Sequence, residues 1–141
     1  SIDSGREALQ EAALEGVRVL LVEDDANLRD AIATVLAECG AQVVAVGCGA
    51  DALQVLKNQA PDVLVSDMAM PGMDGRSLLR RIRQLGARRG GIPAIALTAY
   101  ASPVDRMKAL LAGYQVFLPK PFDPTELITL VAKLAGSTPS S

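Results

Sequence analysis

The chain of 141 residues contains no histidine and no tryptophan, and only 3% of its residues are aromatic. Because half of the residues are hydrophobic, a buried core must be assembled mainly from aliphatic side chains. Such a composition suits a buried parallel β-sheet that is covered by helices. The length is that of a single domain.

Long hydrophobic runs are also missing. The longest, Val17–Val22, is far shorter than the ~20 residues that a membrane-spanning helix needs. The N-terminus shows no basic segment followed by an apolar one, so no secretory signal is visible. The formal net charge of −2 argues against a general nucleic-acid binder. We therefore expect a chain that contacts neither membrane nor nucleic acid.

Cysteine is scarce, with only Cys39 and Cys48. Cys39 falls near the end of a predicted helix, and Cys48 lies just past the following predicted strand. That strand rises by about 20 Å, whereas bridged cysteines need Cα atoms within about 7 Å of each other. Two reduced cysteines fit a cytoplasmic protein.

Short apolar runs alternate with helical patterns about five times along the chain. Because no hairpin signal separates them, the pattern predicts an α/β fold with a doubly wound parallel sheet and helices on both faces. The sequence has no Gly-x-Gly-x-x-Gly after the first run and no Walker loop, which argues against a protein that binds a dinucleotide or a nucleoside triphosphate. The predicted strands are Val17–Val22, Gln42–Val46, Val63–Ser66, Ile92–Leu97 and Gln115–Leu118.

Helices are predicted from apolar residues at helical spacing and from the capping residues beside them. Asp25 is expected at the start of the first helix and Gly40 just after its end. Ser102 is expected to cap a later helix together with Asp105, and Gly113 to close it. The residues expected to face the core are Leu28, Ile32, Val35, Leu36 and Cys39; Leu53 and Leu56 within Ala50–Gln59; Leu78, Leu79, Ile82 and Leu85; and Leu127, Leu130, Val131 and Leu134.

The two ends differ in composition from the rest. Residues 1–16 read as an amphipathic or frayed helix that serves as a leader or linker, and residues 136–141 form a Ser/Thr/Pro tail that we expect to be flexible. The folded domain is therefore expected at residues 17–135.

Four predicted strands end in groups suited to phosphate or metal chemistry. Glu23 and Asp24, Asp67, Thr98 and Lys120 follow or end these runs, and parallel strands would bring all five groups to the carboxyl edge, where open α/β sheets bind ligands. Two carboxylates about 4 Å apart repel each other by roughly 4 kcal/mol at an effective dielectric near 20, so such a cluster must protonate in part or hold a cation. Oxygen ligands without histidine or cysteine select Mg²⁺ or Mn²⁺.

Asp67 is the best candidate for a nucleophile towards phosphorus, because it ends the most apolar run and opens a loop rather than a helix. Lys120 would supply a positive charge and Thr98 a hydroxyl donor to the phosphoryl oxygens. This chemistry works by positioning and charge stabilisation, and needs no histidine.

The chain resembles the receiver domain of two-component response regulators, and is most similar to receivers attached to hybrid sensor histidine kinases. The similarity covers Val17 to about Ala135, so the folded domain at 17–135 would be the receiver. It implies a flavodoxin-like, five-stranded sheet in the order 2-1-3-4-5. The matching segments are Leu21-Val22-Glu23-Asp24-Asp25, Asp67-Met68-Ala69-Met70-Pro71-Gly72-Met73-Asp74-Gly75, Leu97-Thr98-Ala99 and Leu118-Pro119-Lys120-Pro121-Phe122.

The resemblance implies that Asp67 accepts a phosphoryl group from a phosphohistidine on a histidine kinase or a histidine phosphotransfer domain. Such a chain is a phosphoacceptor of a phosphorelay and not a conventional enzyme. The implied Mg²⁺ ligands are Asp24 directly, Glu23 through water, Asp67 itself and the backbone carbonyl of Ala69.

The resemblance also implies a conformational switch. Lys120 would pair with the phosphoryl oxygens and precede a cis peptide bond to Pro121, while Thr98 would move towards the phosphoryl group. Phe117 matches an aromatic switch position that is often tyrosine, and is either such a switch or a fixed core residue. Phe117 has no hydroxyl, so an outward hydrogen bond is impossible while inward packing can still occur.

Two rival functions remain. One is a receiver that acts as a phosphorylation-independent interaction module, although none of the expected site residues is missing. The other is a phosphatase of the haloacid dehalogenase type, against which Ala69 argues because that class needs a second aspartate there. The leader and the resemblance favour a piece of a hybrid kinase. A run of arginines, Arg76, Arg80 and Arg83, reads as a solvated helix face, with partner docking as the alternative.

Overall fold

The computed structural model describes residues 13–86, 90–99 and 102–136. Five parallel strands form one sheet in the order β2-β1-β3-β4-β5, which confirms the expected flavodoxin-like topology. Its fourth strand begins at Ala94 rather than Ile92, because Pro93 has no N–H to donate to a sheet ladder. The strands are β1 (Arg18–Val22), β2 (Gln42–Val46), β3 (Val63–Asp67), β4 (Ala94–Thr98) and β5 (Val116–Pro119).

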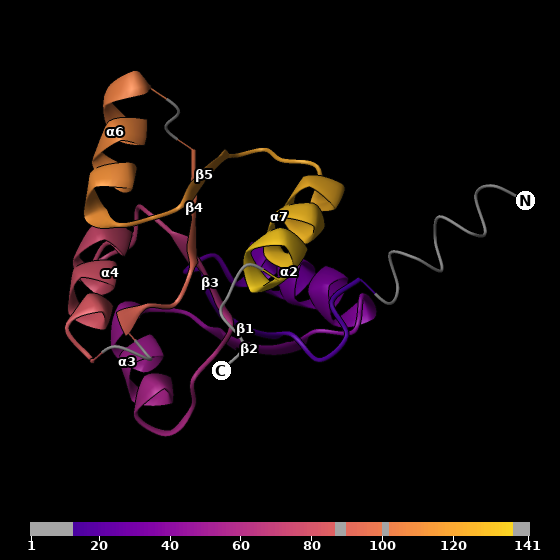
Figure 1. Cartoon of the computed structure of the whole chain (residues 1–141). Coiled ribbons are helices and arrows are strands. Elements are labelled where there is room, and N and C mark those ends of the chain that lie inside the picture. The colour runs from indigo at the N-terminus through magenta and orange to yellow at the C-terminus, as the bar shows by residue number, and fades with distance from the viewer. Residues whose placement is uncertain (1–12, 87–89, 100–101, 137–141) are drawn as a thin grey trace, which may run out of the picture.

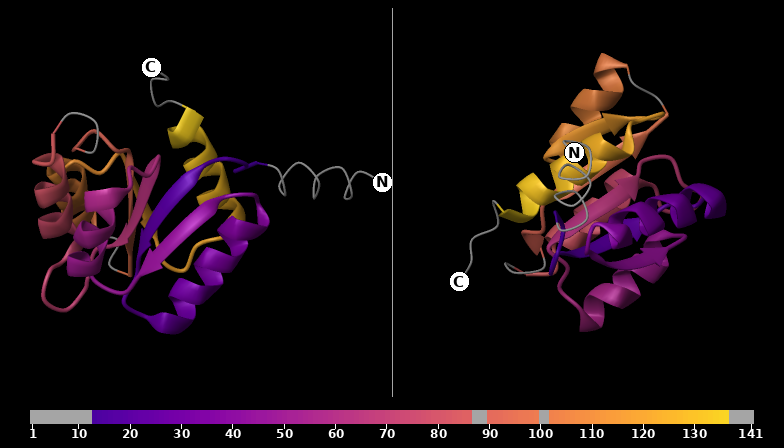
Figure 2. Two further views of the ribbon diagram at one scale, coloured as in Figure 1. Left: turned by 90° about the horizontal axis from the view of Figure 1, so that it is seen from below. Right: turned by 90° about the vertical axis from the view of Figure 1, so that its right-hand side faces the viewer.

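Helices cover both faces of the sheet (Figure 1). Helices α2 and α7 lie on one face, and α3, α4 and α6 lie on the other, as the left-hand view of Figure 2 also shows. This division follows from right-handed crossovers between successive parallel strands. The helices are α2 (Ala26–Glu38), α3 (Gly49–Asn58), α4 (Gly75–Arg83), α6 (Pro103–Ala112) and α7 (Pro124–Gly136).

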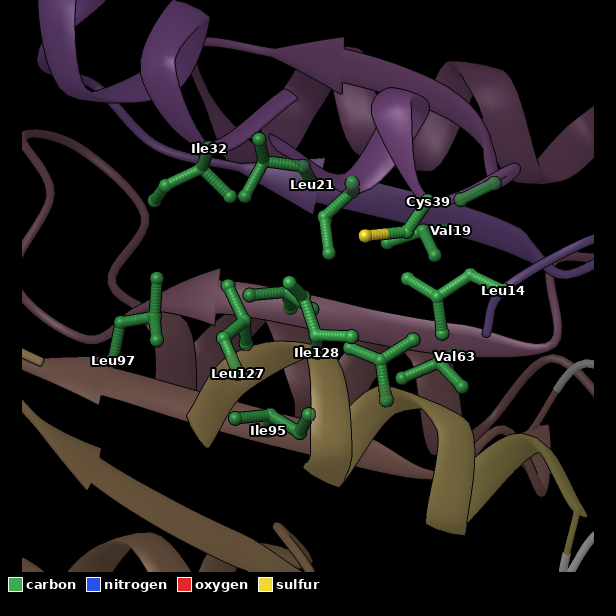
Figure 3. Close-up of a cluster of buried hydrophobic side chains, with 14 of the residues drawn as sticks. Leu14, Val19, Leu21, Ile32, Cys39, Val63, Ile95, Leu97, Leu127 and Ile128 are labelled. Atoms are coloured by element: carbon green, nitrogen blue, oxygen red, sulfur yellow. The ribbon is translucent and has the colours of Figure 1, made fainter. Parts of the chain in front are cut away.

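The core consists of two clusters separated by the sheet, because successive residues of a strand point to opposite faces. The first core cluster packs beneath α2 and α7 (Figure 3) and takes Val19 and Leu21 from β1. The second core cluster packs beneath α3, α4 and α6, and takes Leu20 and Val22 from the same strand. Both clusters are largely aliphatic, as the composition requires.

Part of the expected leader packs into the domain. Leu14 is fully buried in the first core cluster (Figure 3), and its N–H donates to the carbonyl of Cys39 over 2.8 Å. Residues 1–12 of the expected leader and residues 137–141 of the expected tail lie outside the described ranges. Gly136, also assigned to the tail, is the last residue of α7.

The helix caps form at the predicted residues. The Asp25 carboxylate accepts from the N–H of Leu28 over 3.0 Å. The Ser102 hydroxyl accepts from the N–H of Asp105 over 3.1 Å and donates to its carboxylate over 2.7 Å. Gly113 closes α6 with a φ of 112°, a left-handed conformation that glycine adopts without strain.

Two side-chain predictions were wrong. Leu85 is 44% exposed rather than buried. Helix α4 ends at Arg83, so Leu85 lies beyond the helix and does not continue its buried face. Arg83 is not on a solvated face, since its guanidinium donates to the carbonyls of Gly90, Ile92 and Gly113. Arg80, by contrast, is exposed as predicted.

Cys39 and Cys48 do not form a disulfide, as the sequence predicts. Among the helices of the described ranges, none combines the length and the hydropathy that crossing a bilayer requires.

Candidate functional site

The five candidate site residues meet at the carboxyl edge of the sheet. Glu23 and Asp24 follow β1, Asp67 ends β3, Thr98 ends β4 and Lys120 follows β5. Neighbouring strands hold these ends in register, since β3 places Asp67 beside Leu97 and β4 places Thr98 beside Pro119. The parallel topology therefore brings together groups that are widely separated in the sequence.

Glu23, Asp24 and Asp67 form an acidic cluster in which one carboxylate oxygen from each lies within 4.8 Å of the others. Glu23 and Asp67 are buried, whereas Asp24 is exposed. Three hard oxygen donors at this spacing fit a divalent cation of the Mg²⁺ type, which takes a few carboxylates and keeps several waters. The donor set therefore suits the expected magnesium site.

Lys120 is the positive charge of the site. Its Nζ donates to Glu23 Oε1 over 2.7 Å and lies 3.4 Å from Asp67 Oδ1. Burial lowers the pKa of Lys120, but the hydrogen bond to Glu23 and the charge of Asp67 outweigh it and raise the pKa overall. Lys120 thus stays charged and offsets part of the acidic repulsion.

Asp67 is the most perturbed acid of the cluster. Burial, reinforced by the neighbouring Glu23, raises the pKa of Asp67 to about 7 against the opposing charge of Lys120. Burial also acts to raise the pKa of Asp24, but hydrogen bonds with Asp67 and Glu23 outweigh it and lower the pKa. Without a bound cation, Asp67 therefore holds a proton over part of the neutral range, and a cation would favour its ionised form.

The loop after β3 begins at the acidic cluster. The N–H of Ala69 lies 3.4 Å from Asp67 Oδ1 and points to it, and the Ala69 side chain is exposed. The loop ends where the N–H of Gly75 donates to the carbonyl of Met68 over 3.1 Å. The Ala69 carbonyl, an expected Mg²⁺ ligand, thus belongs to a short loop whose two ends are both held by hydrogen bonds.

The expected switch residues lie beside this loop. Thr98 is buried and Phe117 is half-buried, and both line a hollow of about 240 Å³ together with Met68 and Ala69. Phe117 also packs against the second core cluster. Its surroundings therefore accommodate either of the two roles considered for Phe117. The peptide bond between Lys120 and Pro121 is cis, as the resemblance implied.

Sequence reasoning missed Arg29, which supports the site from α2. Its guanidinium donates to the backbone carbonyl of Glu23 over 2.9 Å. The N–H of Asp25 donates to the Glu23 carboxylate over 3.3 Å. Nothing in the helical pattern distinguishes Arg29 from an ordinary surface arginine, because the contact depends on how α2 packs beside β1.

The geometry agrees with a comparison of the whole sequence with protein families. Residues 19–132 match the response regulator receiver domain. The chain belongs to this family. The chain is thus a receiver domain of the kind found in two-component systems, and its flavodoxin-like fold agrees with this membership.

Similar proteins occur in several settings. This receiver domain is 44% identical over 121 residues to an uncharacterized 14.6 kDa protein of Leptolyngbya boryana, covering 86% of this chain and 92% of that protein. It is 41% identical over 125 residues to the response regulator protein FleR of Pseudomonas aeruginosa, covering 88% of this chain but only 26% of FleR. The matched region is therefore a small part of a longer protein in one case and nearly a whole protein in the other.

Among solved structures, the receiver domain of the sensor histidine kinase PA1611 from Pseudomonas aeruginosa PAO1 is 36% identical, with a TM-score of 0.78. The alignment covers 86% of this chain and 99% of that one. The PA1611 structure has a magnesium ion coordinated in its active site cleft.

Proposed function

We propose that this receiver domain is the Mg²⁺-dependent phosphoacceptor of a His–Asp phosphorelay, with Asp67 as the acceptor. The observation that carries the proposal is the position of Asp67, which is buried, lies within 4.8 Å of two further carboxylates and is 3.4 Å from the ammonium of Lys120. A buried carboxylate next to a fixed cation and a candidate metal site is suited to attack phosphorus and to stabilise the product.

In the proposed reaction, a carboxylate oxygen of Asp67 attacks the phosphorus of a phosphohistidine on a kinase or a histidine phosphotransfer domain. The new P–O bond forms as the P–N bond breaks, and the electron pair of that bond remains on the imidazole nitrogen. Lys120 holds the phosphoryl oxygens by charge, and the Thr98 hydroxyl donates to one of them. Phosphorylation then shifts Thr98 and Phe117 between two arrangements.

Asp24 would bind Mg²⁺ directly and Glu23 through water, with Asp67 and the Ala69 carbonyl completing the protein ligands. The bound cation would supply positive charge that neutralises the phosphoryl oxygens. Support comes from the oxygen-only donor set of this chain and from the magnesium ion in the PA1611 receiver.

The test is the intact mass of the chain after incubation with acetyl phosphate, with Mg²⁺ or with EDTA. We expect a gain of one phosphoryl group that requires Mg²⁺ and is absent from Asp67→Asn. A phosphohistidine donor protein serves as the second donor, since some receivers accept only from their own partner. Equal labelling of wild type and Asp67→Asn would refute the assignment of the acceptor.

The second candidate is a receiver that binds partners without phosphorylation. It predicts no labelling from either donor and no response to beryllofluoride, a phosphoryl mimic. A complete set of acid, hydroxyl and lysine at the carboxyl edge favours the phosphoacceptor over this alternative.

A further inference from the structure

Tyr114 is a buried polar residue that the phosphoacceptor chemistry does not use. It lies between the C-cap Gly113 of α6 and the start of β5, is only 2% exposed, and belongs to the second core cluster. Its hydroxyl donates to the backbone carbonyl of Gly75 over 2.7 Å, a contact that spans 39 positions in the sequence. Buried tyrosine hydroxyls are generally hydrogen-bonded, but the partner here is the first residue of α4.

Gly75 in turn lies directly against the backbone of the phosphoacceptor. A Cβ atom at this position would come within 2.6 Å of the Asp67 carbonyl oxygen and 3.0 Å of the Met68 Cα. The Ser66 hydroxyl donates to the same Asp67 carbonyl over 3.0 Å. Burial raises the pKa of Tyr114, so its hydroxyl keeps the proton that it donates. The Tyr114 hydroxyl thus connects the turn after α6 to Gly75, which lies against the Asp67 backbone.

The opposite end of α4 is tied to the same turn. Arg83, the last residue of α4, donates through Nη2 to the carbonyl of Gly113 over 2.9 Å. Its Nη1 donates to the carbonyls of Gly90 and Ile92. Helix α4 is therefore held to residues 113–114 at both of its ends, at the first turn by Tyr114 and at the last residue by Arg83.

We propose that Tyr114 is a positioning residue that links the phosphoacceptor loop, residues 68–74, to the turn between α6 and β5. This inference rests on the proposed function, and it adds a connection separate from Thr98 and Phe117. Because Gly75 packs on the Asp67 carbonyl and Tyr114 holds the Gly75 carbonyl, a displacement of the loop on phosphorylation moves the first turn of α4, and the hydroxyl passes that displacement to the turn.

The test uses amide resonances of the full chain, recorded by NMR before and after addition of Mg²⁺ and beryllofluoride. In the wild type, we expect shifts in the loop and also at residues 113–115. In Tyr114→Phe, which keeps the ring and removes only the hydroxyl, we expect the loop shifts to persist while those at residues 113–115 fall to about half or less.

The matched control is Leu56→Val, a mild truncation in the same core cluster. Leu56 is 1% exposed and lies on α3, so its truncation loosens the second core cluster without touching the Tyr114 hydroxyl. We expect this variant to keep both sets of shifts. A general loss of stability would reduce the response at residues 113–115 in both variants, which would overturn the role of the hydroxyl.

An undiminished response at residues 113–115 in Tyr114→Phe would also overturn the inference, and would assign the coupling to Thr98 and Phe117. Absence of any loop shift in the wild type would instead refute the proposed function, and the inference with it. The two failures are distinguishable because the loop response is measured separately from the response of the turn.

Discussion

Neutralising Asp67 should stabilise the metal-free protein while abolishing its proposed activity. Asp67 lies within 4.8 Å of carboxylate oxygens of Glu23 and Asp24, and 3.4 Å from the Lys120 ammonium. At an effective dielectric near 20, each repulsion is worth about 3.5 kcal/mol and the attraction about 5 kcal/mol. The uncharged Asp67→Asn side chain loses all three, which leaves a net gain of about 2 kcal/mol. Solvent screening at the exposed Asp24 reduces this gain, but removing a charge from a buried position adds to it, so we expect a net gain of about 2 kcal/mol or more.

The pH dependence follows from the direction of the pKa shift. Burial and Glu23 raise the pKa of Asp67 to about 7 in the folded chain, whereas an unfolded aspartate titrates near about 3.9. The folded wild type therefore keeps a proton that the unfolded chain has released, and its stability falls as the pH rises through this interval. The advantage of Asp67→Asn should be absent below about pH 4 and fully developed above about pH 7.

The assay is urea unfolding in EDTA, followed by far-ultraviolet circular dichroism because the chain has no tryptophan. Repeating it in Mg²⁺ provides the control, since a ligand at 100 times its Kd stabilises the folded state by about 2.7 kcal/mol. Wild type should then overtake the variant, whose site has lost a ligand. The reasoning is refuted if Asp67→Asn is the less stable protein in EDTA above about pH 7, or if the difference is independent of pH.

Three further substitutions test other contacts. Asp24→Asn should weaken Mg²⁺ binding by about tenfold or more, measured by calorimetric titration; an unchanged affinity would count against the metal site. Arg83→Met should lower the free energy of unfolding by about 2–4 kcal/mol, because three backbone carbonyls lose a charged donor. The control Arg80→Met, at an exposed position of the same helix, should change the free energy of unfolding by less than about 0.5 kcal/mol. Equal effects of the two substitutions in urea unfolding would contradict a stabilising role for the Arg83 hydrogen bonds. Gly75→Ala should destabilise the fold and displace the Asp67 backbone, since the added Cβ would lie 2.6 Å from the Asp67 carbonyl oxygen. Amide chemical-shift changes that are confined to α4 would contradict a displacement of Asp67.

Much of the fold followed from local patterns. The strand at Gln42–Val46 has the predicted bounds, and the caps at Asp25 and Ser102 form as expected. Burial alternation and capping depend on residues a few positions apart, so they can be read along the chain. The order of the strands in the sheet could not be predicted in this way and rested on the family resemblance. The strand patterns predict which residues are buried, and not which strands are neighbours.

The gathering of the site residues could also be predicted, because parallel strands must place their carboxyl ends at one edge. The sequence alone could not supply the ion pair of Lys120 with Glu23 or the raised pKa of Asp67. Both depend on distances and burial that arise only when β5 and β1 are packed in the same sheet.

The sequence by itself thus determined the alternating strands and helices, their caps and the chemical identity of the edge residues, since these depend on local spacing. Only the tertiary structure decided that Leu14 enters the core, that Arg83 is withdrawn from solvent, and that the Tyr114 hydroxyl reaches Gly75. These contacts join residues from different elements, and a side chain has no local signal of a partner that only helix packing brings within hydrogen-bond distance.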